Sequence, residues 1–249
     1  MHINLGFSNV EKILHVADVH IRNYKRHKEY RQVFRKLYKA AKALPENSII
    51  YLAGDIVHTK TDISPELVSI VSEFFNKLAN IRPTVVIAGN HDANLNNPSR
   101  LDALTPIVEN LNNDNLYYLR DSGIYTFADV DFIVYSILEE SSKWPNPKQS
   151  SSKNKIGLFH GAVNNSKTDA GYTVRDENLP LKTFDGCHMV MLGDIHKYQY
   201  LNSNETTAYA GSLIQQNFGE TFEDHGYVIW DVKSRQSEFF NIHNDYGYY

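Results

Sequence analysis

Five short apolar segments of the sequence are each followed at once by residues that can bind metals or move protons. These residues are Asp18 and His20, Asp55 and His58, Asn90, His91 and Asp92, His160, and Asp194 and His196. Taken singly, an Asp or Asn at the end of a strand is ordinary turn chemistry. Their recurrence after one apolar segment after another favours a shared site.

A subset of these residues forms a donor set that predicts metal ions: Asp18, His20, Asp55, Asn90, His160, Asp194 and His196. Packed together without a counter-ion, such carboxylates and imidazoles would be buried and unpaired, which is strongly unfavourable. Cys187 is the only cysteine, which excludes a thiolate zinc site and an iron–sulfur cluster. Mixed oxygen and nitrogen donors suit Mn²⁺, Fe²⁺ or Zn²⁺. A set of this size fits two ions sharing a carboxylate, about 3.5–4 Å apart, as in hydrolases of phosphate esters.

These donors need a scaffold that brings distant parts of the chain together. The apolar segments 13–17, 49–53, 84–88, 156–159 and 189–192 are short and rich in β-branched residues, which indicates buried strands. Helical spacing of apolar residues predicts an amphipathic helix over 30–44, and Ser64-Pro65-Glu66 marks the start of a second helix that reaches Leu78. This alternation predicts a largely parallel sheet, with ligands beyond the carboxyl ends of its strands.

After Leu111 the sequence changes to a strand-rich pattern. Strands are expected over 116–119, 124–127 and 132–135, and a hairpin over 227–230 and 238–242. The polar stretch 141–154 is expected to form a mobile surface loop. The segment 211–220 is expected to form a loop wall beside the site rather than a helix, because it holds three consecutive amide side chains. Polar clusters of one kind lie on both sides of 141–154, so we expect one domain over residues 1–249.

The motifs, taken in order, resemble a known family. The set D-x-H, G-D-x-x-H, G-N-H-D, a lone His and G-x-x-H is similar to that of the calcineurin-like metallophosphoesterases. The form G-D-I-V-H, with His58, and the segments 192–197 and 209–220 resemble the DNA-end nucleases SbcD and meiotic recombination eleven. The resemblance implies an α/β fold, a four-layer αββα sandwich of two mixed sheets flanked by helices.

The resemblance also implies how two ions would be held: one by Asp18, His20 and His196, the other by Asn90 and His160, with Asp55 bridging them. It makes His91 the general acid, with Asp92 as its orienting partner, and His58 the residue that steadies the scissile phosphate. Asp194 stands where the family usually has His. We expect it to be a metal ligand, and the alternative is a residue that orients His196.

The implied function is a Mn²⁺-dependent DNA nuclease, with exonuclease and endonuclease action at DNA ends during double-strand-break repair or recombination. The implied partners are DNA, an SMC-like ABC ATPase of the SbcC type, and a second copy of the chain in a homodimer. The family's DNA-capping domain and ATPase-binding segment are expected to be absent from this chain. Two alternatives stay open: a phosphatase or phosphodiesterase for small substrates, and a non-catalytic binding scaffold.

The charge distribution bears on the DNA hypothesis. The 249 residues carry a net charge of -4, yet nine Lys and Arg and a single acid lie between residues 22 and 42. Arg22, Lys25 and Arg26 follow His20 directly, so we expect them at the rim of the metal site in contact with phosphates. No apolar run is long enough for a membrane span, and the first ten residues do not resemble a secretory signal. With one cysteine, we expect an intracellular protein.

Overall fold

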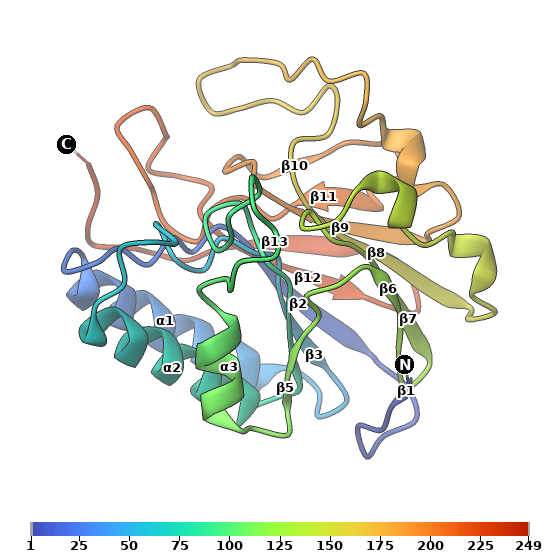
Figure 1. Cartoon of the computed structure of the whole chain (residues 1–249), viewed down its shortest axis with the longest axis horizontal. Helices are drawn as coiled ribbons and strands as arrows, with labels where there is room; N and C mark the ends of the chain where they lie inside the picture. The colour runs from blue at the N-terminus through green and yellow to red at the C-terminus, as the bar shows by residue number, and fades with distance from the viewer. Residues whose placement is uncertain (1, 249) are drawn as a thin grey trace.

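Two β-sheets stacked face to face form the centre of the molecule, in a computed structural model that describes residues 2–248 (Figure 1). The first sheet has the order β13-β12-β2-β3-β4-β5. Its strands are β2 (Lys12–Val16), β3 (Ile49–Leu52), β4 (Thr84–Val86), β5 (Leu116–Tyr118), β12 (Gly226–Asp231) and β13 (Ser237–Asn241). Strands β2 to β5 are parallel, and the β12–β13 hairpin joins β2 in antiparallel orientation.

The second sheet has the order β1-β6-β7-β8-β9-β11-β10. Its strands are β1 (His2–Ile3), β6 (Gly123–Phe127), β7 (Val130–Tyr135), β8 (Asn154–His160), β9 (Met189–Gly193), β10 (Gln199–Tyr200) and β11 (Thr207–Tyr209). Strands β7, β8, β9 and β11 are parallel, and His160 at the end of β8 lies beside Gly193 at the end of β9. Strands β6 and β10 pair antiparallel with β7 and β11, so both sheets are mixed.

Helices cover the outer face of the first sheet. They are α1 (His27–Ala43), α2 (Pro65–Ala79) and α3 (Thr105–Leu111). Helices α1 and α2 contact each other through Phe34 and Phe74, whose rings stack with centroids 4.2 Å apart. Helix α2 begins as expected, because the Ser64 side chain accepts a hydrogen bond from the Leu67 amide and Pro65 occupies the first helical position.

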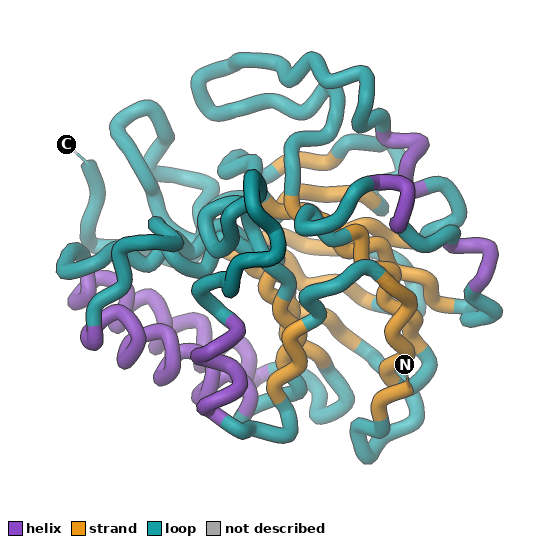
Figure 2. The backbone as a smooth tube through the Cα atoms, viewed as in Figure 1, coloured by secondary structure: helices purple, strands orange, loops and turns teal. Residues whose placement is uncertain are grey.

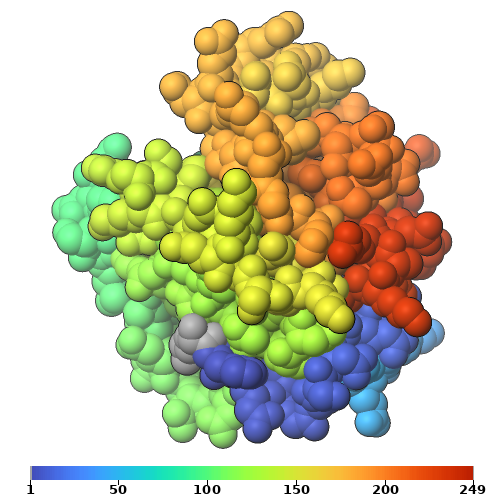
Figure 3. Space-filling view, turned by 90° about the vertical axis from the view of Figure 1, so that its right-hand side faces the viewer, coloured from blue at the N-terminus to red at the C-terminus, as the bar shows by residue number. Residues whose placement is uncertain are grey.

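The outer face of the second sheet has a thinner cover. It consists of loops and the 3₁₀ turns η1 (Ser141–Lys143), η2 (Pro147–Gln149) and η3 (Leu181–Phe184). The stretch 141–154 is thus a loop with two short turns, in which the Trp144 indole donates a hydrogen bond to the Ser136 carbonyl. The four-layer sandwich is confirmed, with its last layer reduced to 3₁₀ turns and loops. The loop between β8 and η3 stands out from this side of the molecule (Figure 3).

The registers of both sheets bring the strand ends to one edge. Val16 of β2 lies beside Leu52 of β3, which lies beside Val86 of β4, so the loops after these strands begin at the same level. Figure 2 shows long loops gathered beyond this end of the strands. Apolar side chains such as Tyr51, Phe132 and Trp230 fill the space between the sheets. None of the described helices combines the length and apolar character that a membrane span requires.

Candidate metal centre

The first sheet supplies three donors on strained backbone. Asp18, His20 and Asp55 have φ angles of 50°, 49° and 52°, in the left-handed region that residues other than glycine seldom adopt. The loops after β2 and β3 hold each other there, because the His20 amide donates to the Asp55 carbonyl at 2.9 Å. The Tyr30 hydroxyl of α1 donates to the His20 carbonyl. Such strain persists where surrounding structure enforces it, and it is frequent at functional sites.

The second sheet supplies the remaining histidines and Asp194, and it approaches the first sheet very closely. The His160 Nδ1 donates a hydrogen bond to the Ala53 carbonyl at 2.7 Å. Its Nε2 is therefore the ring nitrogen that is left to bind a metal ion. A Cβ at Gly54 would lie 2.6 Å from that Nδ1, and a Cβ at Gly193 would collide with the Ala53 carbonyl oxygen. Glycine is therefore required at both positions.

The seven expected ligands come together around Asp55. Its Oδ2 lies 3.5 Å from His20 Nε2, and its Oδ1 lies 3.4 Å from His160 Nε2. On the first side, His20 Nε2 and His196 Nε2 are 3.0 Å apart. On the second side, Asn90 Oδ1 lies 3.3 Å from His160 Nε2. Ligand atoms of Asp18, His20 and His196 all lie within 4.8 Å of one another, as do those of Asp18, Asp55 and His160.

The electrostatics of this cluster show that it favours positive ions. Burial raises the pKa of Asp18 to about 7 and also raises that of Asp194. Burial opposes ionisation of Asp55 as well, but His160 and the other imidazoles lower its pKa below the usual range. Asp18, Asp55 and His160 are almost completely buried. A buried set of carboxylates and imidazoles facing a common point suits divalent cations, and Asp55 offers one oxygen to each side.

Glu220 is a functional residue that sequence reasoning missed. Its Oε1 accepts from His196 Nδ1 at 2.8 Å and from Asn217 Nδ2 at 2.7 Å, and its Oε2 accepts from the Gln216 amide at 2.7 Å. Burial lowers the pKa of His196, but the hydrogen bond to Glu220, together with the negative charges of Asp18, Glu220 and Asp55, raises that pKa to about 9. Glu220 thereby turns His196 Nε2 toward the centre. The only sequence signal was its place in the 209–220 segment. Within that segment, residues 211–220 form a loop wall beside the site, as expected.

The contact between His196 and Glu220 bears on the alternative prediction for Asp194, namely that Asp194 orients His196. His196 takes its orienting hydrogen bond from Glu220, so Asp194 does not orient it. The Asp194 amide donates to the Asp18 carboxylate, and its own Oδ1 lies 3.8 Å from His160 Nε2. Asp194 therefore faces the side of the centre that holds His160. Its φ of 101° adds a fourth strained residue.

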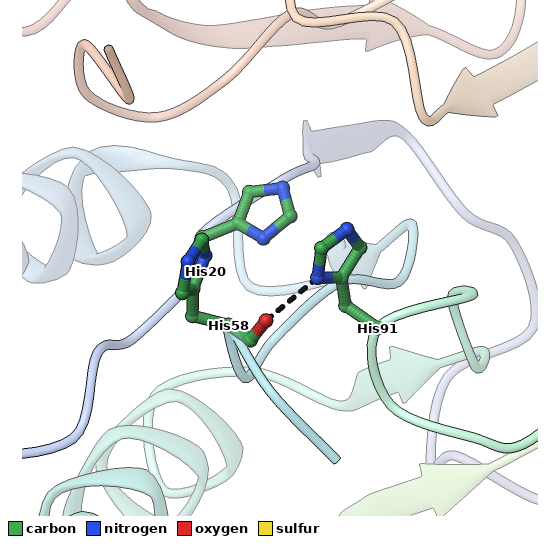
Figure 4. Close-up of side chains that lie close together, drawn as sticks. All are labelled: His20, His58 and His91. Atoms are coloured by element: carbon green, nitrogen blue, oxygen red, sulfur yellow. Dashed lines mark hydrogen bonds between the residues drawn. The ribbon is translucent and has the colours of Figure 1, made fainter. Parts of the chain in front are cut away.

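His58 and His91 stand beside His20 at the mouth of the centre (Figure 4). The His91 Nδ1 donates to the His58 carbonyl at 2.6 Å, which leaves its Nε2 available. This corrects the expectation that Asp92 orients His91. The Asp92 carboxylate accepts instead from the amides of Val57 and Gly89, so it holds the loops that carry the two histidines. Burial and the Arg22 charge lower the pKa of His58 to about 4.

The three basic residues expected at the rim have different surroundings. Arg22 lies 3.1 Å from His58 Nε2 and donates to the Gln216 carbonyl. Lys25 is exposed. Arg26 is engaged by the Glu29 carboxylate through two hydrogen bonds of 2.6 Å and by the Gln215 carbonyl at 2.7 Å. Arg22 therefore contacts His58 at the mouth of the centre, Lys25 is open to solvent, and Arg26 joins its loop to the 211–220 wall.

Comparisons with known proteins agree with this centre. Residues 11–198 match the calcineurin-like phosphoesterase family, and this span includes all seven donors together with His58 and His91. The chain is 46% identical over 97% of its length to uncharacterized protein R555 of Acanthamoeba polyphaga mimivirus, of which it spans 19%. It is 25% identical over 90% of its length to the SbcD subunit of nuclease SbcCD from Staphylococcus epidermidis, of which it spans 67%.

Two further similarities are more limited. A putative phosphoesterase 244L of invertebrate iridescent virus 6 is 26% identical over 73% of this chain. The solved structure of TT1561 of Thermus thermophilus superposes with a TM-score of 0.58 over 94% of this chain and 100% of its own, at 15% identity, which supports the fold alone. The family match carries more weight, because it covers most of the chain and all of the donors. The chain belongs to the calcineurin-like phosphoesterase family.

Proposed function

We propose that this chain is the catalytic domain of a metal-dependent DNA nuclease that hydrolyses phosphodiester bonds near DNA ends. The observation that carries the proposal is a basic face that starts at the metal centre. Exposed Lys25 follows Arg22 at the rim, and exposed basic side chains continue along α1: Lys28, Arg31, Arg35, Lys39 and Lys42. A helix of 17 residues spans about 25 Å. A face of that length suits a polyanion, whereas a small phosphate ester needs only the rim.

The side chains around the centre are arranged for hydrolysis of a phosphodiester. Divalent ions held by the seven donors would offset phosphate charge and lower the pKa of the attacking water. Arg22 and the neutral His58 would hold a non-bridging oxygen of the phosphate at the mouth. His91 would donate its Nε2 proton to the departing sugar oxygen, while its Nδ1–H stays bonded to the His58 carbonyl. The P–O bond to the sugar breaks as the bond from water forms.

We propose Mn²⁺ as the working ion, because the centre combines imidazoles with carboxylates and an amide. The similarity to the SbcD subunit supports two partners for the longer protein, an SbcC-type ABC ATPase and a second copy of this chain. It also supports a role in repair or recombination of broken DNA. The partners and the role in repair or recombination rest on the similarity to the SbcD subunit.

The test is degradation of end-labelled duplex and single-stranded DNA with Mn²⁺, with Mg²⁺ or with EDTA. We expect shortening that needs the metal and is strongest with Mn²⁺. Absence of cleavage under every condition, in a protein that binds Mn²⁺, would refute the nuclease. Hydrolysis of small phosphodiesters without any DNA cleavage would support the small-substrate alternative. Failure to bind Mn²⁺ would support the non-catalytic scaffold.

A further inference from the structure

An aromatic side chain projects into solvent from the loop that lines the metal centre. Phe218 is 74% exposed, although its neighbours Asn217 and Gly219 line a cavity of about 230 Å³ that also contacts Asp194 and His196. Large apolar side chains are usually withdrawn from water, and the mechanism above gives Phe218 no task. An exposed aromatic ring beside a phosphodiesterase centre is a candidate contact for the substrate.

The turn that carries Phe218 is held in place. The Gly219 amide donates to Asn217 Oδ1 at 2.8 Å, and Asn217 Nδ2 donates to Glu220 Oε1 at 2.7 Å. The same oxygen of Glu220 accepts from the His196 ring. The position of Phe218 is thus tied to a metal ligand through two hydrogen-bonded side chains. A ring fixed in this way loses little conformational freedom when a ligand stacks on it.

Phe218 is also the outer member of a stack of three side chains. Its ring meets that of Tyr248 edge-on, with centroids 4.9 Å apart, and the Arg26 guanidinium lies 4.9 Å from the centroid of Tyr248. Figure 1 shows the C-terminal segment and the loop before β12 on the same side of the molecule as the start of α1. Glu29 fixes Arg26 in turn. The stack therefore joins three separate parts of the chain and presents Phe218 at its outer end.

The rim loop adjoins this stack and adds charge and a second exposed ring. Arg22 and Arg26 donate to the carbonyls of Gln216 and Gln215, which joins the rim loop to the loop of Phe218. Between these arginines lies Tyr24, whose side chain is 70% exposed. Cationic side chains that follow a phosphate backbone, together with exposed rings that accept bases, are the usual means of holding a single strand.

We propose that Phe218 is a stacking platform for an unpaired nucleobase, and that the centre takes the single-stranded part of a DNA end. This inference rests on the proposed nuclease function and names the form of DNA that the site binds. Inside a duplex each base is already stacked on both of its faces, so a duplex offers the ring only the outer face of its terminal pair. An unpaired end offers both a phosphate for Arg22 and Lys25 and a base for Phe218.

The test measures binding without cleavage. Fluorescence anisotropy in EDTA would follow a labelled oligothymidylate of about 15 nucleotides, an abasic strand of equal length and a blunt duplex. Phe218→Ala and Phe218→Leu should each weaken oligothymidylate binding by about 5- to 100-fold, while Phe218→Trp should preserve it. The abasic strand should bind the wild type and the three Phe218 variants alike, and the duplex should lose much less affinity than oligothymidylate does. Leu101→Ala removes a similarly exposed apolar side chain elsewhere and should change nothing.

Two results would overturn the inference. One is oligothymidylate binding by Phe218→Leu at the wild-type affinity. The other is an equal loss for the abasic strand, which would show that no base contact is involved. Unchanged melting temperatures of the variants would exclude misfolding as a cause. Because the readout is binding in EDTA, an inactive wild type that still prefers bases would refute the nuclease and leave the platform standing.

Discussion

Replacement of Glu220 by Gln tests how the 211–220 loop orients the proposed metal ligand His196. The side chain is isosteric, so the loop can keep its shape, but only one oxygen remains. If that oxygen stays with His196 and Asn217, the new amide faces the Gln216 amide, and a buried donor loses its partner. Such a loss destabilises the fold by about 1–3 kcal/mol. Loss of the charge that fixes His196 should weaken Mn²⁺ binding about 10- to 100-fold, equal to about 1.4–2.8 kcal/mol.

Calorimetric titration with Mn²⁺ and thermal unfolding without metal would separate the two effects. Glu223→Gln makes the same chemical change at an exposed position three residues away and serves as the control. Burial alone would raise the pKa of Glu220, but the bond from His196 lowers it, while the pKa of His196 rises to about 9. The pair therefore stabilises the metal-free protein above about pH 5, and this stabilisation fades as the pH rises through about 9.

The stability difference between wild type and Glu220→Gln should follow the same window. It should be greatest between about pH 5 and 6.5, should shrink as the pH rises from there through about 9, and should also shrink at acidic pH once the Glu220 carboxylate takes up a proton. Unchanged Mn²⁺ affinity in Glu220→Gln would refute the reasoning, since it would mean that His196 is oriented without this contact. A loss of equal size in Glu223→Gln would point to the overall charge of the loop instead.

Three further predictions concern the general acid, the metal ligands and the basic face. His91→Asn should lower the rate of DNA cleavage by about 10²- to 10⁴-fold with unchanged Mn²⁺ stoichiometry, and equal rates at full occupancy would contradict its role as general acid. The gain in melting temperature on Mn²⁺ loading should grow from pH 5 to pH 8. The reason is that Asp18 and His196, with pKa values of about 7 and 9, must lose protons before they bind the metal. A gain independent of pH would argue against these two residues as ligands. The double variant Lys25→Glu, Lys28→Glu should reduce the salt slope of DNA binding by about two ion equivalents, and an unchanged slope would exclude these lysines from the DNA contact.

Much of the fold could be predicted because its signals are local. The apolar segments before Asp18 and Asp55 became β2 and β3, and the cap at Ser64 opened α2 as expected. Elements with few residues were not predicted, because a periodic pattern of apolar residues cannot be recognised in so short a segment. Helix α3 has seven residues and strand β1 has two, and β1 pairs with β6, more than a hundred residues away.

The candidate site could be predicted as a set of residues but not as a set of contacts. Residue types and order predicted seven donors that the structure brings together, since the chemistry of metal binding restricts which side chains can take part. Their partners could not be read in the same way. The contact of His196 with Glu220 spans 24 residues, and His91 turns to a backbone carbonyl rather than to its neighbour Asp92. Such pairings depend on how loops fold in three dimensions, which spacing along the chain does not encode.

Because Gly54 and Gly193 have no side chains, the two sheets can approach closely at the metal centre. His20 and Asp55 come from one sheet and His160 from the other, so the distance between the sheets fixes the distance between opposing donors. A Cβ at Gly193 would lie 2.8 Å from His160 Nδ1, and one at Gly54 would lie 2.6 Å from it, where ordinary contact begins at 3.4 Å. A Cβ at either position would have to push His160 away by more than the difference of about 0.3–0.5 Å between Mg²⁺–oxygen and Ca²⁺–oxygen bond lengths. The spacing between the donors of the two sheets thus depends on two glycines as well as on the donors themselves.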